Sequence, residues 1–122
     1  MMLGMKDAEM KNVNKHPKKE LLSEIVSRVT SLAGARRVIL FGSAALGKMN
    51  RDSDIDLLVL QSAQGNARAE SVRLRDALRG LGYPIDVIVM PLKRFEETKD
   101  VIGSVAYPAN KYGKVIYDTA RQ

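Results

Sequence analysis

The first regular pattern of apolar and polar positions along the chain has helical spacing. Its apolar members stand three or four residues apart and therefore share one side of a helix: Leu22, Ile25, Val29 and Leu32. Pro17 is suited to open this helix and Gly34 to end it. No periodicity precedes it, so we expect a flexible tail over residues 1–16 and a single domain over residues 17–122.

Three apolar runs farther along are short and rich in β-branched residues, as buried strands are: Val38–Phe41, Ile55–Leu60 and Ile85–Met90. A helical pattern separates the second run from the third. It begins after the N-cap candidate Asn66 and extends to about Leu81, where Gly82 ends it. A strand, a helix and a strand in this order form a crossover unit, so these two strands should be parallel neighbours.

The C-terminal third of the chain continues the alternation. A helix is expected after Pro91, and Pro108 must stop it. Its apolar side consists of three residues: Phe95, Ile102 and Val105. A turn over Asn110–Gly113 then leads into a short edge strand at Val115–Tyr117. With a stub of helix after the first strand, the order is α-β-α-β-α-β-α-β, which predicts an α/β (α+β) fold with a small mixed sheet of about four strands flanked by helices.

Composition narrows the classes of protein to which the chain can belong. The 122 residues include no cysteine, which excludes disulfides and thiolate metal sites and favours the cytoplasm. No apolar run is long enough to predict a membrane span. The net charge of +6 favours polyanionic partners such as nucleotides, nucleic acid or an acidic protein surface. Basic residues are not interleaved with aromatic ones, so no dedicated nucleic-acid groove is predicted.

Small and acidic residues beside two of the predicted strands suggest chemistry. Gly42-Ser43 follows the first strand, and after ten further residues Asp54 and Asp56 mark the start of the second. A small-residue turn can hold phosphates on its backbone N–H groups, and two aspartates on one face of a strand can hold divalent ions. Together these features suggest nucleotidyl transfer. The alternative is a Gly-Ser turn, with Ser43 as a helix N-cap, beside a solvated acidic strand edge.

A third aspartate, Asp86, occupies the same early position in the third strand. If the two strands are parallel neighbours, Asp86 lies beside Asp54 and Asp56. Three adjacent carboxylates repel one another and raise at least one pKa unless cations neutralise them. Hard oxygen ligands suit Mg²⁺, or Mn²⁺, better than Zn²⁺. We therefore expect the three aspartates to hold two such ions, which could clamp the attacking and leaving oxygens of an in-line displacement.

This motif resembles the polymerase-beta-type nucleotidyltransferase superfamily, and the short chain is most similar to its minimal members, the MNT proteins. Those proteins are commonly encoded beside a HEPN-domain ribonuclease toxin and act as its antitoxin. The resemblance implies that Gly42 and Ser43 bind the β- and γ-phosphates of ATP. It implies that the catalytic carboxylates and Mg²⁺ ligands are Asp54, Asp56 and Asp86. The implied reaction is transfer of AMP to a tyrosine hydroxyl of the partner toxin.

The turn departs from the family pattern in its charge. Related turns often carry arginines shortly after Gly-Ser, where this chain has Ala44 and Leu46. Two alternatives follow: either the phosphates bind less tightly, or Lys48 and Arg51 supply the missing charge to the nucleotide. Ser53 is a further nucleotide-binding candidate.

Other functions stay open on the sequence. The chain could be a non-catalytic binding module that blocks its toxin by complex formation and keeps the acidic site for nucleotide-dependent docking. It could transfer a nucleotide to a small molecule, although the lack of a second domain to build an acceptor pocket favours a protein acceptor. Its charge also allows nucleic-acid binding, which would weaken steeply with salt.

Overall fold

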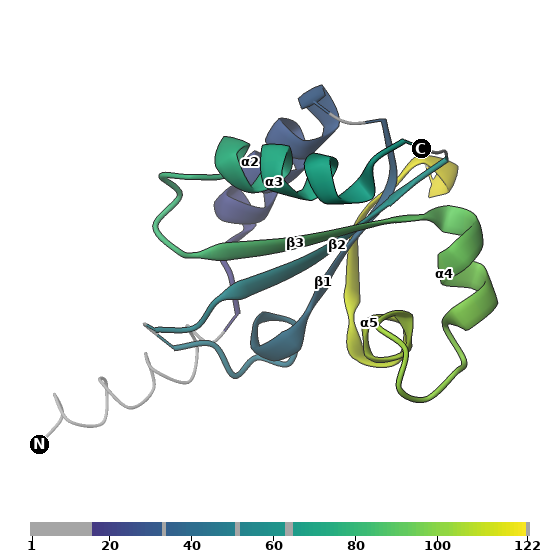
Figure 1. Cartoon of the computed structure of the whole chain (residues 1–122). Helices are drawn as coiled ribbons and strands as arrows, with labels where there is room; N and C mark the ends of the chain where they lie inside the picture. The colour runs from purple at the N-terminus through teal and green to yellow at the C-terminus, as the bar shows by residue number, and fades with distance from the viewer. Residues whose placement is uncertain (1–15, 33, 51, 63–64, 122) are drawn as a thin grey trace, which may run out of the picture.

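The structure, a computed structural model, describes residues 16–32, 34–50, 52–62 and 65–121, so all but the last residue of the predicted tail lie outside it. The elements follow one another in this order (Figure 1): α2 (Lys19–Leu32), β1 (Ala35–Phe41), the 3₁₀ turn η1 (Gly42–Ala44), β2 (Ile55–Gln61), α3 (Ala67–Ala77), β3 (Ile85–Pro91), α4 (Leu92–Thr98), α5 (Ala106–Tyr112), β4 (Lys114–Asp118) and η2 (Thr119–Arg121).

The four strands form one mixed sheet in the order β3-β2-β1-β4. Strands β2 and β3 are parallel, as predicted, and α3 crosses between them. Strand β1 is antiparallel to both of its neighbours, β2 and β4. The predicted edge strand at Val115–Tyr117 falls within β4. The structure thus confirms the expected fold class, a small mixed sheet flanked by helices.

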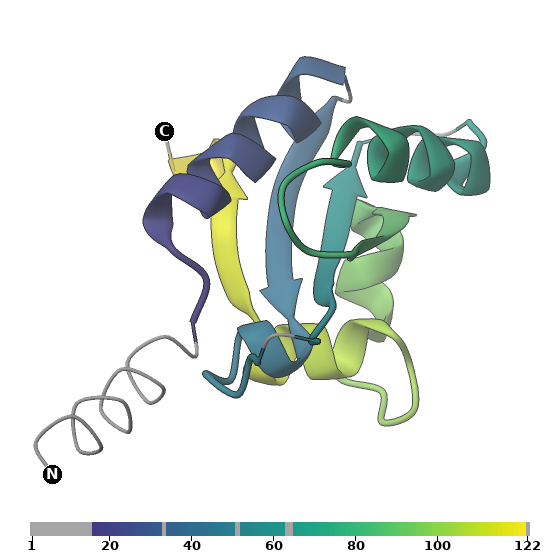
Figure 2. The same ribbon diagram turned by 90° about the vertical axis from the view of Figure 1, so that its left-hand side faces the viewer.

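Helices cover both faces of this sheet (Figures 1 and 2). Helices α2 and α3 pack on one face and α4 and α5 on the other, each pair over its own apolar core. Side chains alternate along a strand, so neighbouring residues of β2 enter different cores. Leu57 and Val59 pack beneath α2 and α3, whereas Leu58 and Leu60 pack beneath α4 and α5.

Helix α3 begins as predicted and ends earlier than predicted. The side chain of Asn66 accepts a hydrogen bond from the Ala69 N–H at 3.1 Å, which makes Asn66 the N-cap. The helix ends at Ala77, not near Leu81. The reason is that Gly80 adopts a φ of +86°, which breaks the right-handed helix before Gly82 is reached.

The single helix predicted after Pro91 is wrong, because two helices, α4 and α5, occupy that segment. Gly103, with a φ of +99°, lies between them. The hydroxyl of Ser104 accepts a hydrogen bond from the Tyr107 N–H at 3.1 Å, which supports the start of α5. Pro108 does not stop a helix but sits in the first turn of α5, where a missing N–H costs nothing.

The residues assigned to one side of that helix also differ in their burial. Phe95 is buried, but Ile102 and Val105 are 81% and 46% exposed. The predicted turn over Asn110–Gly113 is mostly the end of α5.

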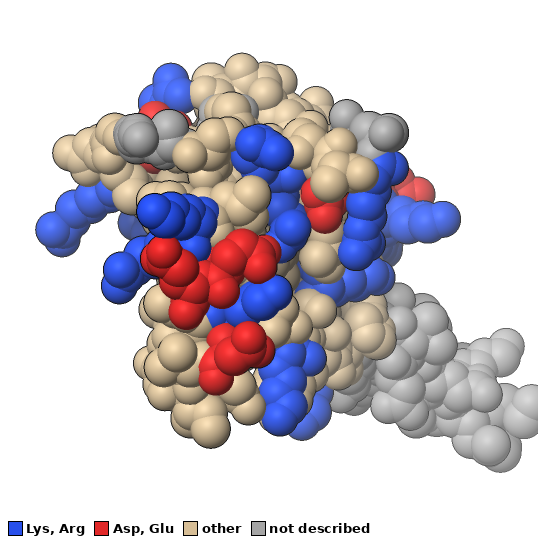
Figure 3. Space-filling model, turned by 90° about the vertical axis from the view of Figure 1, so that its right-hand side faces the viewer, with Lys and Arg blue, Asp and Glu red and all other residues tan. Residues whose placement is uncertain are grey.

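Ion pairs tie β1, β4 and α4 together at the start of β1. Arg37 contacts Asp118 at 3.2 Å and Glu96 at 3.5 Å, and Lys99 contacts Glu96 at 2.9 Å. On the side of the molecule where α4 lies, acidic side chains gather between lysines and arginines (Figure 3).

None of the helices in the described part of the chain has the length and apolar character that crossing a membrane requires.

Candidate functional site

The three predicted aspartates lie at the start of β2 and β3. Asp56 and Asp86 are direct partners in the parallel register of these strands, and Asp54 stands two residues before Asp56. Asp56 belongs to the side of β2 that faces α4 and α5, since it alternates with Leu57. The predicted placement of Asp86 beside the pair is therefore confirmed.

Asp56 is the least exposed of the three carboxylates. Its side chain is half-buried, whereas Asp54 and Asp86 are exposed. Burial raises the pKa of Asp56, and the neighbouring charges of Asp86 and Asp54 raise it further. A carboxylate in such surroundings is stabilised by any cation that reaches it.

Gly42 brings the backbone of the turn against the same carboxylate. In the antiparallel pairing of β1 with β2, Phe41 stands opposite Asp56, so the next residue turns past the carboxylate. Gly42 has a φ of +74°, and a Cβ at this position would collide with Asp56 Oδ2. Glycine is therefore required here both by the backbone conformation and by the close approach.

The turn after Gly42 is fixed by its backbone and by one buried side chain. Ala45 N–H donates to the Gly42 carbonyl at 3.1 Å, and Lys48 N–H donates to the Ser43 carbonyl at 2.9 Å. Ala44 is fully buried in the core beneath α2 and α3. An arginine could not stand at Ala44 without burying its charge, which explains the departure from the family pattern at this position.

Ser43 does not act as a helix N-cap, which corrects one reading of the sequence. It lies inside η1, and the residue before that turn, Phe41, makes no side-chain capping bond. The Ser43 hydroxyl makes no hydrogen bond with another described residue, so it is available to a ligand.

The remaining nucleotide-binding candidates stand on the loop between η1 and β2. Lys48 is exposed, and Arg51 lies outside the described residues. The hydroxyl of Ser53 accepts a hydrogen bond from the Asn50 N–H at 2.9 Å, so it shapes the loop. Binding of the nucleotide by these three residues stays a prediction.

The carboxylates form an acidic neighbourhood and not a closed ligand cage. Over the ranges 16–32, 34–50, 52–62 and 65–121, no group of three or more His, Cys, Asp or Glu side chains is gathered tightly enough to hold a metal ion. The chemistry of the donors nevertheless fits Mg²⁺, which takes few protein carboxylates and completes its shell with water and phosphate oxygens. The half-buried carboxylate of Asp56, which the exposed carboxylates of Asp54 and Asp86 repel, fits the same ion.

Sequence reasoning missed the contact between Gly42 and Asp56. It depends on the antiparallel pairing of β1 with β2, which the sequence analysis did not predict. The sequence holds no decisive signal for this pairing, because the 13 residues between the two strands are long enough for either a turn or a crossover.

The arrangement joins the Gly42–Ala44 turn, the carboxylates of Asp54 and Asp56, and a third carboxylate, Asp86, on the next strand. Comparison with known proteins assigns its class. Residues 19–108 match the family described as a nucleotidyltransferase domain. The match covers well over half of the chain, so the chain belongs to this family and is a nucleotidyltransferase. No protein with a curated description matches the chain.

Several solved structures have a similar fold. A toxin-antitoxin complex with AMP-PNP has a TM-score of 0.63 at 20% identity, over 82% of this chain and 75% of that chain. The MntA-HepT toxin-antitoxin structure has a TM-score of 0.58 at 18% identity, over 85% and 75% of the two chains. A complex of the tri-AMPylated Shewanella oneidensis HEPN toxin with an MNT antitoxin has a TM-score of 0.58 at 18% identity, over 84% and 74%. At these identities the likeness establishes the fold.

Proposed function

We propose that this chain is an antitoxin of the MNT type, which transfers AMP from ATP to a tyrosine hydroxyl of a partner HEPN-type ribonuclease toxin and so neutralises it. The observation that carries the proposal is the pairing of Asp56 with Asp86, beside a glycine whose backbone packs on the Asp56 carboxylate. The fold shared with a structure described as a tri-AMPylated HEPN toxin with an MNT antitoxin supports the choice of acceptor. The reaction consumes ATP, and we expect the protein in the cytoplasm.

Each end of the site has a role in this reaction. The backbone and hydroxyl of Gly42-Ser43 hold the β- and γ-phosphates, which aims the α-phosphorus at the carboxylates. Asp86 holds the acceptor hydroxyl and takes its proton as the new oxygen–phosphorus bond forms. The bond from the α-phosphorus to the bridging oxygen breaks, and pyrophosphate leaves with that electron pair. Mg²⁺ held by Asp54 and Asp56, and on the acceptor side by Asp86, would supply the positive charge that these phosphates need.

The test uses ATP labelled on the α-phosphate, Mg²⁺, the purified chain and a lysate of its source organism. We expect label on one protein band with the wild type and none with an Asp54→Asn/Asp56→Asn variant of the same fold. Mass spectrometry of that band then identifies the modified residue. Label on a small molecule in place of a protein would overturn the choice of acceptor, and equal labelling by the variant would overturn the site.

One observation favours a second function, that of a binding module that blocks the toxin by contact. The three aspartates do not form a tight cluster among the described residues, as a ready-made metal site would. An Asp86→Asn variant separates the two functions. A binding module would still neutralise its toxin with this change, whereas an AMP transferase would form the complex and fail to neutralise it.

A further inference from the structure

Exposed apolar side chains gather on the elements that cover the face to which Asp56 and Asp86 belong. Between α4 and α5, three of them stand close together in the chain: Val101, Ile102 and Val105. Val101 is 54% exposed and Ile102 is 81% exposed. This segment is the lowest part of the domain in Figure 1, and at that height Figure 3 shows uncharged surface below the acidic side chains. Apolar side chains that are grouped in this way mark an interaction surface.

Hydrogen bonds hold the segment between α4 and α5 in place. The Val101 N–H donates to the Thr98 carbonyl at 2.9 Å, and the Ser104 N–H donates to the Val101 carbonyl at 3.1 Å. The Ser104 hydroxyl donates to the Thr98 carbonyl at 2.8 Å. A segment that is fixed before binding loses little conformational entropy when a partner covers it.

Ile88 extends the apolar surface toward the carboxylates. Val87 is buried beneath α2 and α3, so its neighbours Asp86 and Ile88 point to the opposite face of the sheet. Ile88 stands two residues, or about 7 Å, beyond Asp86 on the way to α4, which begins at Leu92. Met90 is buried beneath α4 and α5, whereas Ile88 is 37% exposed. An uncovered apolar side chain therefore stands beside a carboxylate of the site, on an edge strand that a partner can reach.

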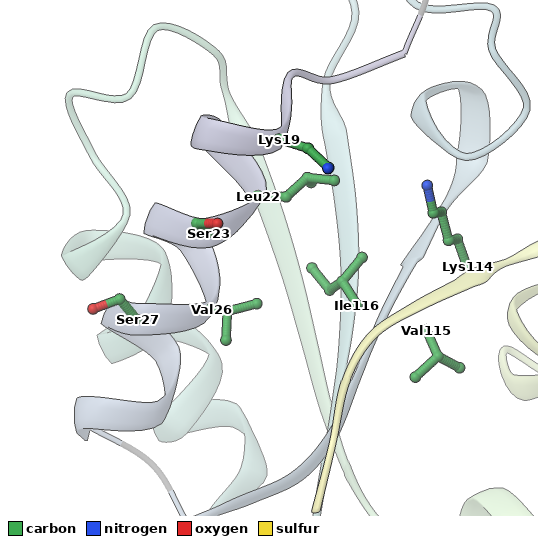
Figure 4. A pocket seen from close by; sticks show the side chains of 8 residues that line it. All are labelled: Lys19, Leu22, Ser23, Val26, Ser27, Lys114, Val115 and Ile116. Carbon is green, nitrogen blue, oxygen red and sulfur yellow. The ribbon is translucent and has the colours of Figure 1, made fainter. Parts of the chain in front are cut away.

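The groove between α2 and β4 lies on the wrong face to receive the acceptor. It has a volume of about 470 Å³, and Leu22, Val26 and Ile116 line it (Figure 4). Leu22 and Ile116 pack against the core beneath α2 and α3, which is on the face opposite Asp56. The acceptor hydroxyl must therefore be held by surface on the other face, where Asp86 is exposed.

We propose that the exposed apolar surface formed by Ile88, Val101, Ile102 and Val105 docks the protein that carries the acceptor hydroxyl. The inference rests on the proposed function, because it assigns the surface that delivers the acceptor to Asp86. A protein interface covers about 800 Å² on each partner and has an apolar core, whereas a small acceptor needs an enclosing pocket. The surface makes only apolar contacts, and the transfer step stays with the carboxylates.

The experiment uses the full chain and the protein that it labels in the lysate, purified after its identification by mass spectrometry. Ile102→Glu introduces a charge where the side chain is exposed, so the fold should be kept. We expect this variant to bind the acceptor protein about thirtyfold more weakly and to show a raised KM for it. The kcat at saturating acceptor and the affinity for ATP should be unchanged. Ile88→Ser should weaken binding in the same direction.

Val101→Glu and Val72→Glu form the matched pair of variants. The two valines are 54% and 50% exposed, but Val72 lies on α3, on the opposite side of the sheet. We expect Val101→Glu to weaken binding of the acceptor protein and Val72→Glu to leave it unchanged. The same titrations with ATP check that neither change disturbs the site.

The outcomes separate the docking surface from the proposed function. Wild-type affinity for the acceptor protein in Ile102→Glu and Val101→Glu would overturn the docking surface and leave the proposed function standing. An equal loss in Val72→Glu, or a loss of ATP affinity in every variant, would show a general effect on the fold and overturn it as well. A wild-type dimer that Ile102→Glu converts to a monomer in light scattering would assign the surface to a second copy instead. A wild-type chain that labels no protein would overturn the proposed function and the inference together.

Discussion

The two faces of the sheet differ in how completely their helices cover them. Beneath α2 and α3, six inward residues of β2 and β3 are buried: Ile55, Leu57, Val59, Ile85, Val87 and Val89. Beneath α4 and α5 the cover stops part way along the strands. Leu58 and Leu60 are buried there, but Ile88 is 37% exposed and Asp86 is exposed. We call the face beneath α2 and α3 the closed face, and it holds the domain together. We call the uncovered end of the other face the open end, and it carries the carboxylates.

Because of this difference, residues that stabilise the fold alternate along one strand with residues of the candidate site. Leu57 and Asp56 are neighbours in β2 and point to opposite faces. Substitutions one residue apart should therefore have opposite profiles, one lowering the free energy of unfolding and the other lowering activity. The predictions below test this separation.

The largest expected effect is on activity, at the open end. Asp56→Asn should lower AMP transfer by about a thousandfold or more, because it removes the central carboxylate of the site while the fold is kept. The measurement is the initial rate of label transfer from α-labelled ATP, with circular dichroism to check the fold. Activity within tenfold of the wild type would exclude Asp56 from the chemistry.

The matched change on the closed face is Leu57→Ala. Leu57 is fully buried, so the truncation should lower the free energy of unfolding by about 3 kcal/mol. Denaturant titration measures the loss, and the rate of AMP transfer per folded molecule should stay near that of the wild type. Full stability combined with lost activity would contradict the separation of the two faces.

Gly42→Ala tests the point where the turn meets the carboxylate. The positive φ alone should cost about 1–2 kcal/mol, and the collision with Asp56 should also displace the site and weaken ATP binding. Gly80→Ala is the control, because Gly80 has a φ of +86° and no atom within 4 Å of its added Cβ. Equal effects on ATP affinity would show that the contact with Asp56 has no role in binding.

The main part of the site could be predicted from the sequence because local patterns determine it. A strand, a helix and a strand require a parallel pair, and two aspartates at equal depth in that pair must then meet. The contact of Gly42 with Asp56 and the burial of Ala44 depend on packing between segments that no local pattern specifies. The same is true of the groove between α2 and β4, whose lining includes Lys19 and Lys114 from segments far apart in the chain.

The segment between β3 and β4 was predicted incorrectly because its proline can mark either the start or the end of a helix. Proline is tolerated in the first turn of a helix and excluded from its interior, so Pro108 alone cannot tell a start from a stop. The signals that decide are Gly103, whose positive φ separates the two helices, and Ser104, which supports the start of the second. Apolar residues such as Ile102 then lie outside both helices and reach the surface.

The smallest expected effect is the dependence of stability on pH, and it should differ in sign between the two ends of the sheet. In metal-free protein, burial and two neighbouring carboxylates hold the pKa of Asp56 above its unfolded value. Its ionised form therefore opposes folding at neutral pH, and this cost disappears as pH falls through the raised pKa. Asp56→Asn should raise the melting temperature at pH 7 and lose that advantage in acid. The shift should be small because water screens the half-exposed carboxylate.

Asp118, at the opposite end of the sheet, provides the contrast. The N–H of Ala120 and then the charge of Arg37 lower the pKa of Asp118, so its ionised form stabilises the fold above its unfolded pKa. Asp118→Asn should therefore lower the melting temperature at pH 7, and the deficit should shrink as pH falls through the lowered pKa. Thermal melts of both variants in EDTA, between pH 7 and the onset of acid unfolding, measure the two slopes. Slopes of the same sign would mean that burial and the neighbouring carboxylates do not raise the pKa of Asp56 in the folded protein.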